Sequence, residues 1–298
     1  MWNGVINVYK PKGFTSHDVV AKMRGIMGMK KIGHTGTLDP LAEGVLPVCL
    51  GNGTRLCDML TEKEKEYEAV LLLGKTTDTQ DITGTVVKER EVVSSEEEVR
   101  EAIKSFEGEY DQIPPMYSAL KVNGKKLYEL ARAGKEVERK ARRVVIYEIQ
   151  ILQMDLPYVK IRVLCSKGTY IRTLCEDIGG KLGCGGCMTQ LVRTKVGRFC
   201  LQDAVTLERL QQSKEEGTLE QWIVRTDACF ENCPAFHIRE TFEKLVENGN
   251  SFSPLQTQEG TICPDGQWVR IYAAGGRFYG IYAYDSDKSI YRPVKMFL

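Results

Sequence analysis

The sequence is poor in histidine and in net charge, and it contains no long apolar run. Only three of its 298 residues are histidines, and 41 basic side chains against 40 acidic ones leave a formal charge of +1. The net charge therefore gives no indication of a nucleic acid or a membrane as partner. Evidence for such a partner has to come from local clusters of charged residues. Because no stretch approaches bilayer length and polar residues interrupt the start of the chain, we expect a cytoplasmic protein without a signal peptide.

Motifs of several enzyme classes are also missing. No Gly-x-Ser-x-Gly elbow is present, and no cysteine has an obvious histidine partner, which argues against hydrolases. The segment LLLGKTT at 71–77 lacks the earlier glycine of a phosphate-binding loop, so a nucleotide-dependent enzyme stays only as an alternative. Cys184 and Cys187 have the spacing of half a zinc site without a second pair, and we expect the ten cysteines to be reduced thiols and no metal to be bound.

The near-neutral total hides a strong segregation of charge. Residues 121–143 carry nine basic and three acidic side chains, and residues 158–198 carry eight and two, which gives each segment a charge of +6. Residues 89–111 carry nine acidic and three basic side chains, a charge of −6. The two basic segments are the ones that could bind an anionic partner.

Strands and helices are both predicted, without regular βαβ alternation, and this favours an α+β fold. A helix is expected to begin at Thr15 or Ser16, and another at Ser95, where Glu98 completes a capping box. The sequence pattern changes around 227–234. After this point we expect one helix at 239–248 and closely spaced hairpins, one of which turns at Gly275. The other expected segments are a strand in the opening 4–9, a loop at 33–51, a strand pair within 66–87, strands at 142–154 and 158–168, and a helix in 169–183.

One carboxylate stands apart from the forty acidic residues, most of which lie in charged runs. Asp39 lies in GHTGTLDPLAEGVLPVCLG (33–51), between Leu38 and Pro40. A carboxylate in such apolar surroundings is partly desolvated, which costs several kcal/mol unless a cation or hydrogen-bond donors compensate. An Asp-Pro turn that caps its own backbone explains the residue equally well.

The same segment resembles the aspartate motif of the bacterial TruB-type tRNA pseudouridine synthases, and four further motifs, one before it and three after it, occur in the family's order. They are INVYKPKGFTSHDVV, KEYEAVLLLGKTTDTQDITG, IPPMYSALKVNGKKLYELARAGKEVERKARRV, and the pair GTYIRTLCEDIG and LVRTKVGRF. The resemblance implies a mixed-sheet catalytic domain over 1–228, with an RNA-binding insertion near 112–143. It also implies a PUA-like RNA-binding domain over 229–298, a monomer without an obligate protein partner, and no cofactor.

The resemblance further implies that the enzyme isomerises the T-loop uridine of tRNA, position 55, to pseudouridine after flipping the base out. Asp39 is the implied nucleophile, and Arg172 is its expected counter-charge, although Arg172 could instead pair with Glu176 at helical spacing. Tyr67 is the implied base that stacks on the uracil and removes its C5 proton, although a core tyrosine is the alternative.

Further residues are expected to contact the RNA. His34 would fill the space that the flipped base leaves, since a mostly neutral ring can stack without adding charge. Tyr117 and Tyr128 could stack on bases or simply pack. Phosphate contacts are expected from Lys10, Lys121, Lys125, Arg132, Arg142, Arg143 and Arg193. The alternative function is a tRNA-binding or folding factor that has no catalytic role and in which Asp39 only shapes a turn.

Overall fold

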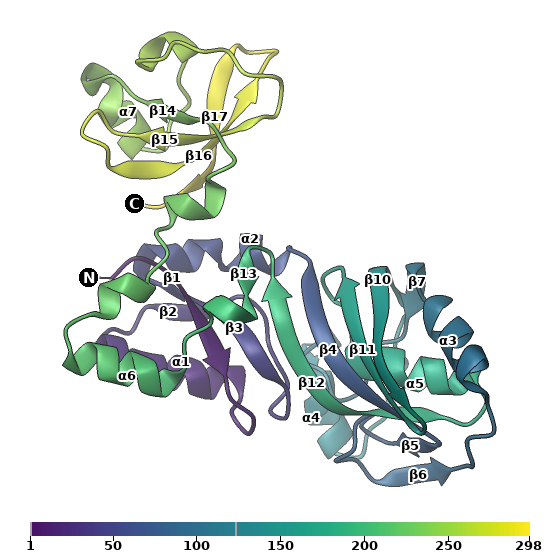
Figure 1. The fold of residues 1–298 in the computed structure, drawn as a ribbon. Helices are drawn as coiled ribbons and strands as arrows, with labels where there is room; N and C mark the ends of the chain where they lie inside the picture. Colours follow the sequence, from purple (N-terminus) through teal and green to yellow (C-terminus); the bar gives the residue numbers. More distant parts are fainter. Residues whose placement is uncertain (1, 123) are drawn as a thin grey trace.

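A computed structural model describes residues 2–122 and 124–298, so Asn123 of the predicted basic segment lies outside it. The chain forms a large lobe on one mixed sheet and a small β-rich lobe at the C-terminal end (Figure 1). The predicted α+β class is thereby confirmed. Within the described residues, no helix is long and apolar enough to cross a membrane.

The large sheet is made of β1 (Gly4–Lys10), β2 (Ile32–His34), β3 (Glu43–Leu50), β4 (Lys65–Leu73), β7 (Gly108–Gln112), β10 (Arg142–Asp155), β11 (Tyr158–Cys165), β12 (Gly186–Val196) and β13 (Phe199–Cys200). The order is β1-β3-β12-β4-β11-β10-β7, with β2 paired to β3 and β13 paired to β12. The β3–β12 pair is parallel and the other pairs are antiparallel. The sheet is therefore mixed, and β4, β12 and β3 lie side by side at its middle.

Two pairs of helices cover this sheet: α1 (Ser16–Met27) with α6 (Leu207–Glu215), and α3 (Glu96–Lys104) with α5 (Ile171–Lys181). The first pair packs with β1 and β3 around one apolar core, and the second packs with β4, β10 and β11 around another (Figure 1). The predicted helix starts are confirmed, because Thr15 and Ser95 each accept a capping-box hydrogen bond from the backbone of the third helical residue.

Short elements complete the large lobe. They are α2 (Cys57–Thr61), α4 (Leu127–Arg132), the hairpins β5 (Lys75–Thr77) with β6 (Val86–Glu89) and β8 (Lys121–Val122) with β9 (Lys125–Lys126), and the 3-10 turns η1 (Gly51–Leu56), η2 (Leu201–Asp203), η3 (Leu219–Trp222) and η4 (Asp227–Phe230). The segment GKTT thus runs into a hairpin, without the helix N-terminus that a phosphate-binding loop requires.

The small lobe has its own four-stranded sheet and its own core, in which tyrosines and phenylalanines predominate. Its strands are β14 (Ala235–His237), β15 (Trp268–Tyr272), β16 (Phe278–Asp285) and β17 (Ile290–Met296). The expected turn at Gly275 does join β15 to β16. The helix expected over 239–248 is present but irregular, because a 3-10 turn η5 (Glu240–Phe242) runs directly into α7 (Glu243–Glu247). A further 3-10 turn, η6 (Pro254–Gln256), follows.

The loop expected over 33–51 is also wrong in its second half, which forms β3. This strand is buried on both faces: Leu46 and Val48 face α1 and α6, whereas Val45 and Cys49 pack with residues of the small lobe such as Phe297. A strand buried on both faces has no alternation of polar and apolar residues to reveal it. The loop proper is therefore only the part between β2 and β3, and it carries Asp39.

Candidate functional site

The loop between β2 and β3 is held in place from below by buried polar groups. The hydroxyl of Ser16, at the first turn of α1, accepts a hydrogen bond from the backbone N–H of Leu38 at 2.9 Å. The ammonium of Lys10, at the end of β1, donates to the carbonyl oxygens of Pro40 and Ala42. These bonds fix the backbone on both sides of Asp39.

Asp39 forms an ion pair with Arg172. The distance from Arg172 Nε to Asp39 Oδ2 is 2.9 Å, and the two side chains are 5% and 41% exposed. The alternative pairing of Arg172 with Glu176 is not seen, because Glu176 accepts from Gln80 instead. The carboxylate is more exposed than its apolar neighbours suggest: Leu38 and Ala42 turn into the core, while Asp39 faces a pocket.

Three separate segments determine the orientation of the Arg172 guanidinium. Besides Asp39, it donates from Nη1 to the carbonyl oxygen of Thr79 at 2.9 Å and from Nη2 to that of Tyr117 at 2.8 Å. Asp81 Oδ2 lies 3.9 Å from Nη1 and adds negative charge. A nearly buried guanidinium with this many acceptors can hold a carboxylate in one orientation.

A small pocket of about 100 Å³ opens over this ion pair. One wall comes from β4 and β12 through Tyr67 and Leu191, and another from the start of α5. The lining residues are Thr37, Leu38, Asp39, Tyr67, Thr169, Tyr170, Ile171, Arg172 and Leu191. Aromatic rings and aliphatic side chains line several sides of this pocket, and one carboxylate and one guanidinium lie at its floor. Such a lining suits a planar base.

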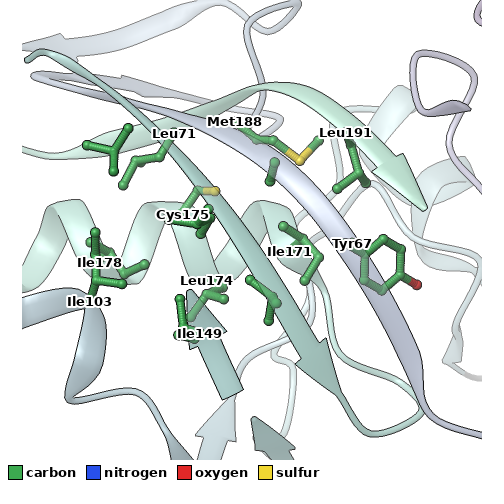
Figure 2. Close-up of a cluster of buried hydrophobic side chains, with 14 of the residues drawn as sticks. Tyr67, Leu71, Ile103, Ile149, Ile171, Leu174, Cys175, Ile178, Met188 and Leu191 are labelled. Carbon is green, nitrogen blue, oxygen red and sulfur yellow. The ribbon is translucent and has the colours of Figure 1, made fainter. Parts of the chain in front are cut away.

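Tyr67 ends the apolar cluster between the sheet and α5. Figure 2 shows its ring beside Ile171 and Leu191, with the hydroxyl directed away from the other labelled side chains. Burial raises the pKa of this phenol, and the charge and hydrogen bond of Arg193 act in the opposite direction. Tyr67 is thus both a core residue and a lining residue, so the two interpretations made from the sequence are not exclusive.

Two residues that were expected to contact phosphates are buried instead. Lys10 is 0% exposed, and its ammonium faces the carbonyls below Asp39. Arg193 is 2% exposed and donates to the carbonyl oxygens of Val45 at 2.7 Å and Gly36 at 3.3 Å. Both predictions are therefore wrong, because each cation already serves backbone carbonyls around the loop and has no surface to offer to RNA.

His34 lies at the start of the same loop and is half-buried. Its ring meets that of His17 edge to face, with the centroids 5.6 Å apart. Burial and the neighbouring charges of His17 and Arg193 lower the pKa of His34, which favours the neutral imidazole at pH 7. The neutral ring that we expected at this position therefore agrees with its surroundings; its stacking role stays a prediction.

The remaining basic candidates are all on the surface, but they are not equally free. Lys121, Lys125, Arg132 and Arg142 are exposed on or beside the hairpin β8–β9, α4 and β10. Arg143 is exposed as well, but its guanidinium binds Asp111 and Glu109 across the sheet edge. Tyr128 lies under the cations of Lys126 and Arg132, which leaves it part of the same basic surface.

The cysteine pair takes no part in this site. Cys184 and Cys187 are buried free thiols, and among the described residues no group of His, Cys, Asp and Glu has the arrangement of a metal centre. Sequence reasoning missed Asp81 and the carbonyls of Thr79 and Tyr117. The polar stretch TDTQD (77–81) between two strands was a signal that could have pointed to Asp81 and Thr79, but it does not include Tyr117.

The chain matches two family descriptions over most of the large lobe. Residues 24–171 match "TruB family pseudouridylate synthase (N terminal domain)", and residues 172–231 match "tRNA pseudouridylate synthase B C-terminal domain". A tRNA pseudouridine synthase B of Lachnoclostridium phytofermentans is 51% identical over 306 residues, which cover 99% of this chain and 100% of that protein. One of Clostridium acetobutylicum is 48% identical over 279 residues, 94% of each chain.

Two solved structures share the fold over nearly the whole chain. A chain from an H/ACA RNP bound to a substrate RNA containing 2'-deoxyuridine superposes with a TM-score of 0.73 at 27% identity, covering 99% of this chain and 85% of that one. A chain from an archaeal box H/ACA sRNP Nop10-Cbf5 complex gives a TM-score of 0.72 at 28% identity, covering 99% and 86%.

The burial of Lys10 predicts a pH dependence of folding. Burial lowers the pKa of Lys10 from 10.5 to about 8, against the opposing charge of Asp39. Between pH 8 and 10.5 the unfolded chain therefore keeps a proton that the folded chain has released, so Lys10 makes the free energy of unfolding rise with pH in this window. We expect the free energy of unfolding in urea to rise with pH for the wild type relative to Lys10→Met, by up to about 3 kcal/mol between pH 8 and 10.5. Lys12→Met, at an exposed lysine, serves as the control and should show no such rise. If the difference in free energy of unfolding between the wild type and Lys10→Met is also independent of pH, the lowered pKa of Lys10 is refuted.

Proposed function

Because the chain belongs to the TruB family of pseudouridylate synthases, we propose that it isomerises a uridine of tRNA to pseudouridine with Asp39 as nucleophile. The family and the α+β fold predicted from the sequence are both confirmed by the matches. One observation carries the proposal for the site: the Asp39 carboxylate is paired with the nearly buried Arg172 at the floor of a pocket that a planar base could enter.

The reaction exchanges one bond to the ribose for another. The bond between N1 of uracil and C1′ breaks, the bond between C5 and C1′ forms, C5 loses its proton and N1 gains one. No electrons, phosphate or water are consumed overall, so the chemistry needs only a nucleophile, a base and a site that holds the detached uracil. Asp39 supplies the nucleophile, and Arg172 orients its carboxylate.

Tyr67 is the proposed base and stacking partner. Its ring lines the pocket with Leu191, so a uracil between them would be held while C1′ is transferred. The buried phenol stacks on the base in its neutral form. It can accept the C5 proton only after it has given its own proton to N1 of the uracil, and the charge and hydrogen bond of Arg193 favour the phenolate that this leaves. The target base must leave its stack to reach this pocket, at a cost of a few kcal/mol, and we propose that the neutral His34 ring occupies the space it leaves.

We propose the T-loop uridine, position 55, as the target and the T-arm as the RNA element bound. The exposed Lys121, Lys125, Arg132 and Arg142 supply phosphate contacts, with Arg143 contributing once its pairing with Asp111 is exchanged. Residues 1–228 form the proposed catalytic domain, with its RNA-binding insertion near 112–143, and residues 229–298 the proposed PUA-like RNA-binding domain. We also propose that the chain acts as a monomer.

Asp39→Asn should remove the activity while leaving the fold and RNA binding intact. The amide keeps the shape of the side chain but neither attacks carbon nor pairs with Arg172, so the single-turnover rate should fall by at least about 10⁴-fold. The assay maps pseudouridine in a tRNA transcript by mass spectrometry, with the exposed Asp155→Asn as control. Isomerisation by Asp39→Asn at the wild-type rate would refute Asp39 as the nucleophile. A wild type that binds tRNA but forms no pseudouridine would favour the tRNA-binding factor, and wild-type product at another position would refute the choice of position 55.

Removing the hairpin lysines should weaken tRNA binding in a salt-dependent way. For Lys121→Gln combined with Lys125→Gln, the slope of log K against log salt should become shallower by about one for each phosphate that the protein no longer binds. Fluorescence titrations from 50 to 300 mM salt, roughly the range in which such contacts are screened, measure this slope. Arg100→Gln, on the acidic helix α3, is the control; equal slopes for all three proteins would place the RNA elsewhere.

A further inference from the structure

The turn between β5 and β6 contains a residue in an unfavourable backbone conformation. Gln80 has φ 64°, and Ser289 is the other non-glycine residue with positive φ in the described chain. L-residues avoid this region because the Cβ approaches the neighbouring carbonyl, and a β-carbon is what glycine lacks. A glutamine is therefore kept here at a cost, and its side chain is the place to look for the compensation.

The side-chain amide of Gln80 is fixed at both ends by the helix that carries Arg172. Thr173 Oγ1 donates to Gln80 Oε1 at 2.8 Å, and Gln80 Nε2 donates to the carboxylate of Glu176. The backbone is held as well, since the carbonyl oxygen of Gln80 accepts from Met188 of β12 at 3.0 Å. Gln80 thus connects the turn to α5 and to the sheet.

This connection determines where the preceding carbonyl points. The angle φ of Gln80 describes rotation about its N–Cα bond, and that rotation sets the plane of the peptide group shared with Thr79 relative to the fixed side chain. The carbonyl oxygen of that peptide group is the one that accepts from Arg172 Nη1 at 2.9 Å. With the usual negative φ at Gln80, the clamped side chain and this carbonyl could not both keep their places.

We propose that Gln80 is a positioning residue for the isomerisation: its amide locks the turn to α5 so that the Thr79 carbonyl fixes the guanidinium that orients Asp39. This inference rests on the proposed function, because the reaction it serves is pseudouridine formation. Arg172 contacts the Asp39 carboxylate through Nε, and its Nη atoms donate to the carbonyls of Thr79 and Tyr117. If one of these carbonyls moves away, the guanidinium can rotate about its side-chain bonds and present Nε to Asp39 at a different angle.

A local turn role and the positioning role predict opposite results for glycine. Gln80→Gly relieves the left-handed conformation and would leave a mere turn unchanged or more stable. If the amide lock matters, Gln80→Gly should lower the single-turnover rate on a tRNA transcript by about tenfold or more, with the tRNA Kd changed by less than about twofold. Ser289→Gly, which relieves the same conformation in the distant β16–β17 turn, is the matched control and should keep the wild-type rate.

A charge-exchanged pair tests the contact itself. Gln80→Glu places two carboxylates against each other and should be as slow as Gln80→Gly. Adding Glu176→Gln to Gln80→Glu lets the new amide donate to the new carboxylate while Thr173 still donates to it, so this double variant should recover most of the rate. Thermal unfolding of each variant shows that the folded protein is being compared.

The outcomes separate this inference from the proposed function. If the wild type forms no pseudouridine in tRNA, the proposed function fails first. If the wild type is active and Gln80→Gly keeps its rate, or if the double variant stays as slow as Gln80→Glu, the positioning role of Gln80 is refuted and the proposed function stands.

Discussion

The ion pair between Asp39 and Arg172 is the interaction on which the rest of the site depends. It joins the loop after β2 to the first turn of α5, and the other donors of the guanidinium reach the carbonyls of Thr79 and Tyr117. Segments from four parts of the chain therefore meet at one planar group. A guanidinium is suited to this because its donors point in fixed directions and its charge survives burial.

Two further cations, Lys10 and Arg193, form the frame under the loop. Burying a charge costs several kcal/mol unless polar groups surround it, and here backbone carbonyls around the Asp39 loop do so. These carbonyls replace water around each cation. A shift of the loop would therefore leave the buried cation without hydrogen-bond acceptors. Hydrogen bonds from the two buried cations thus hold the loop backbone, while the Asp39 carboxylate itself stays partly exposed.

Much of this could be predicted from the sequence, and the failures have physical reasons. Capping boxes and the α+β class follow from local patterns, and the pairing of Asp39 with Arg172 follows from the family resemblance. The burial of Lys10 and Arg193 could not be predicted, because the sequence does not show whether a basic side chain will face a phosphate group or backbone carbonyls. The strand β3 was missed because burial on both faces removes its alternation, and Asp81 because its polar turn reaches Arg172 only in the folded chain.

The most direct test of the central claim is the single-turnover rate of Arg172→Lys on a tRNA transcript, measured beside its tRNA affinity. Lysine keeps the positive charge near Asp39 but cannot hold the carboxylate, Thr79 and Tyr117 in one fixed plane. The account predicts a rate lower by about 100-fold or more, with the affinity changed by only a few-fold. A wild-type rate for Arg172→Lys would contradict it, since charge alone would then suffice.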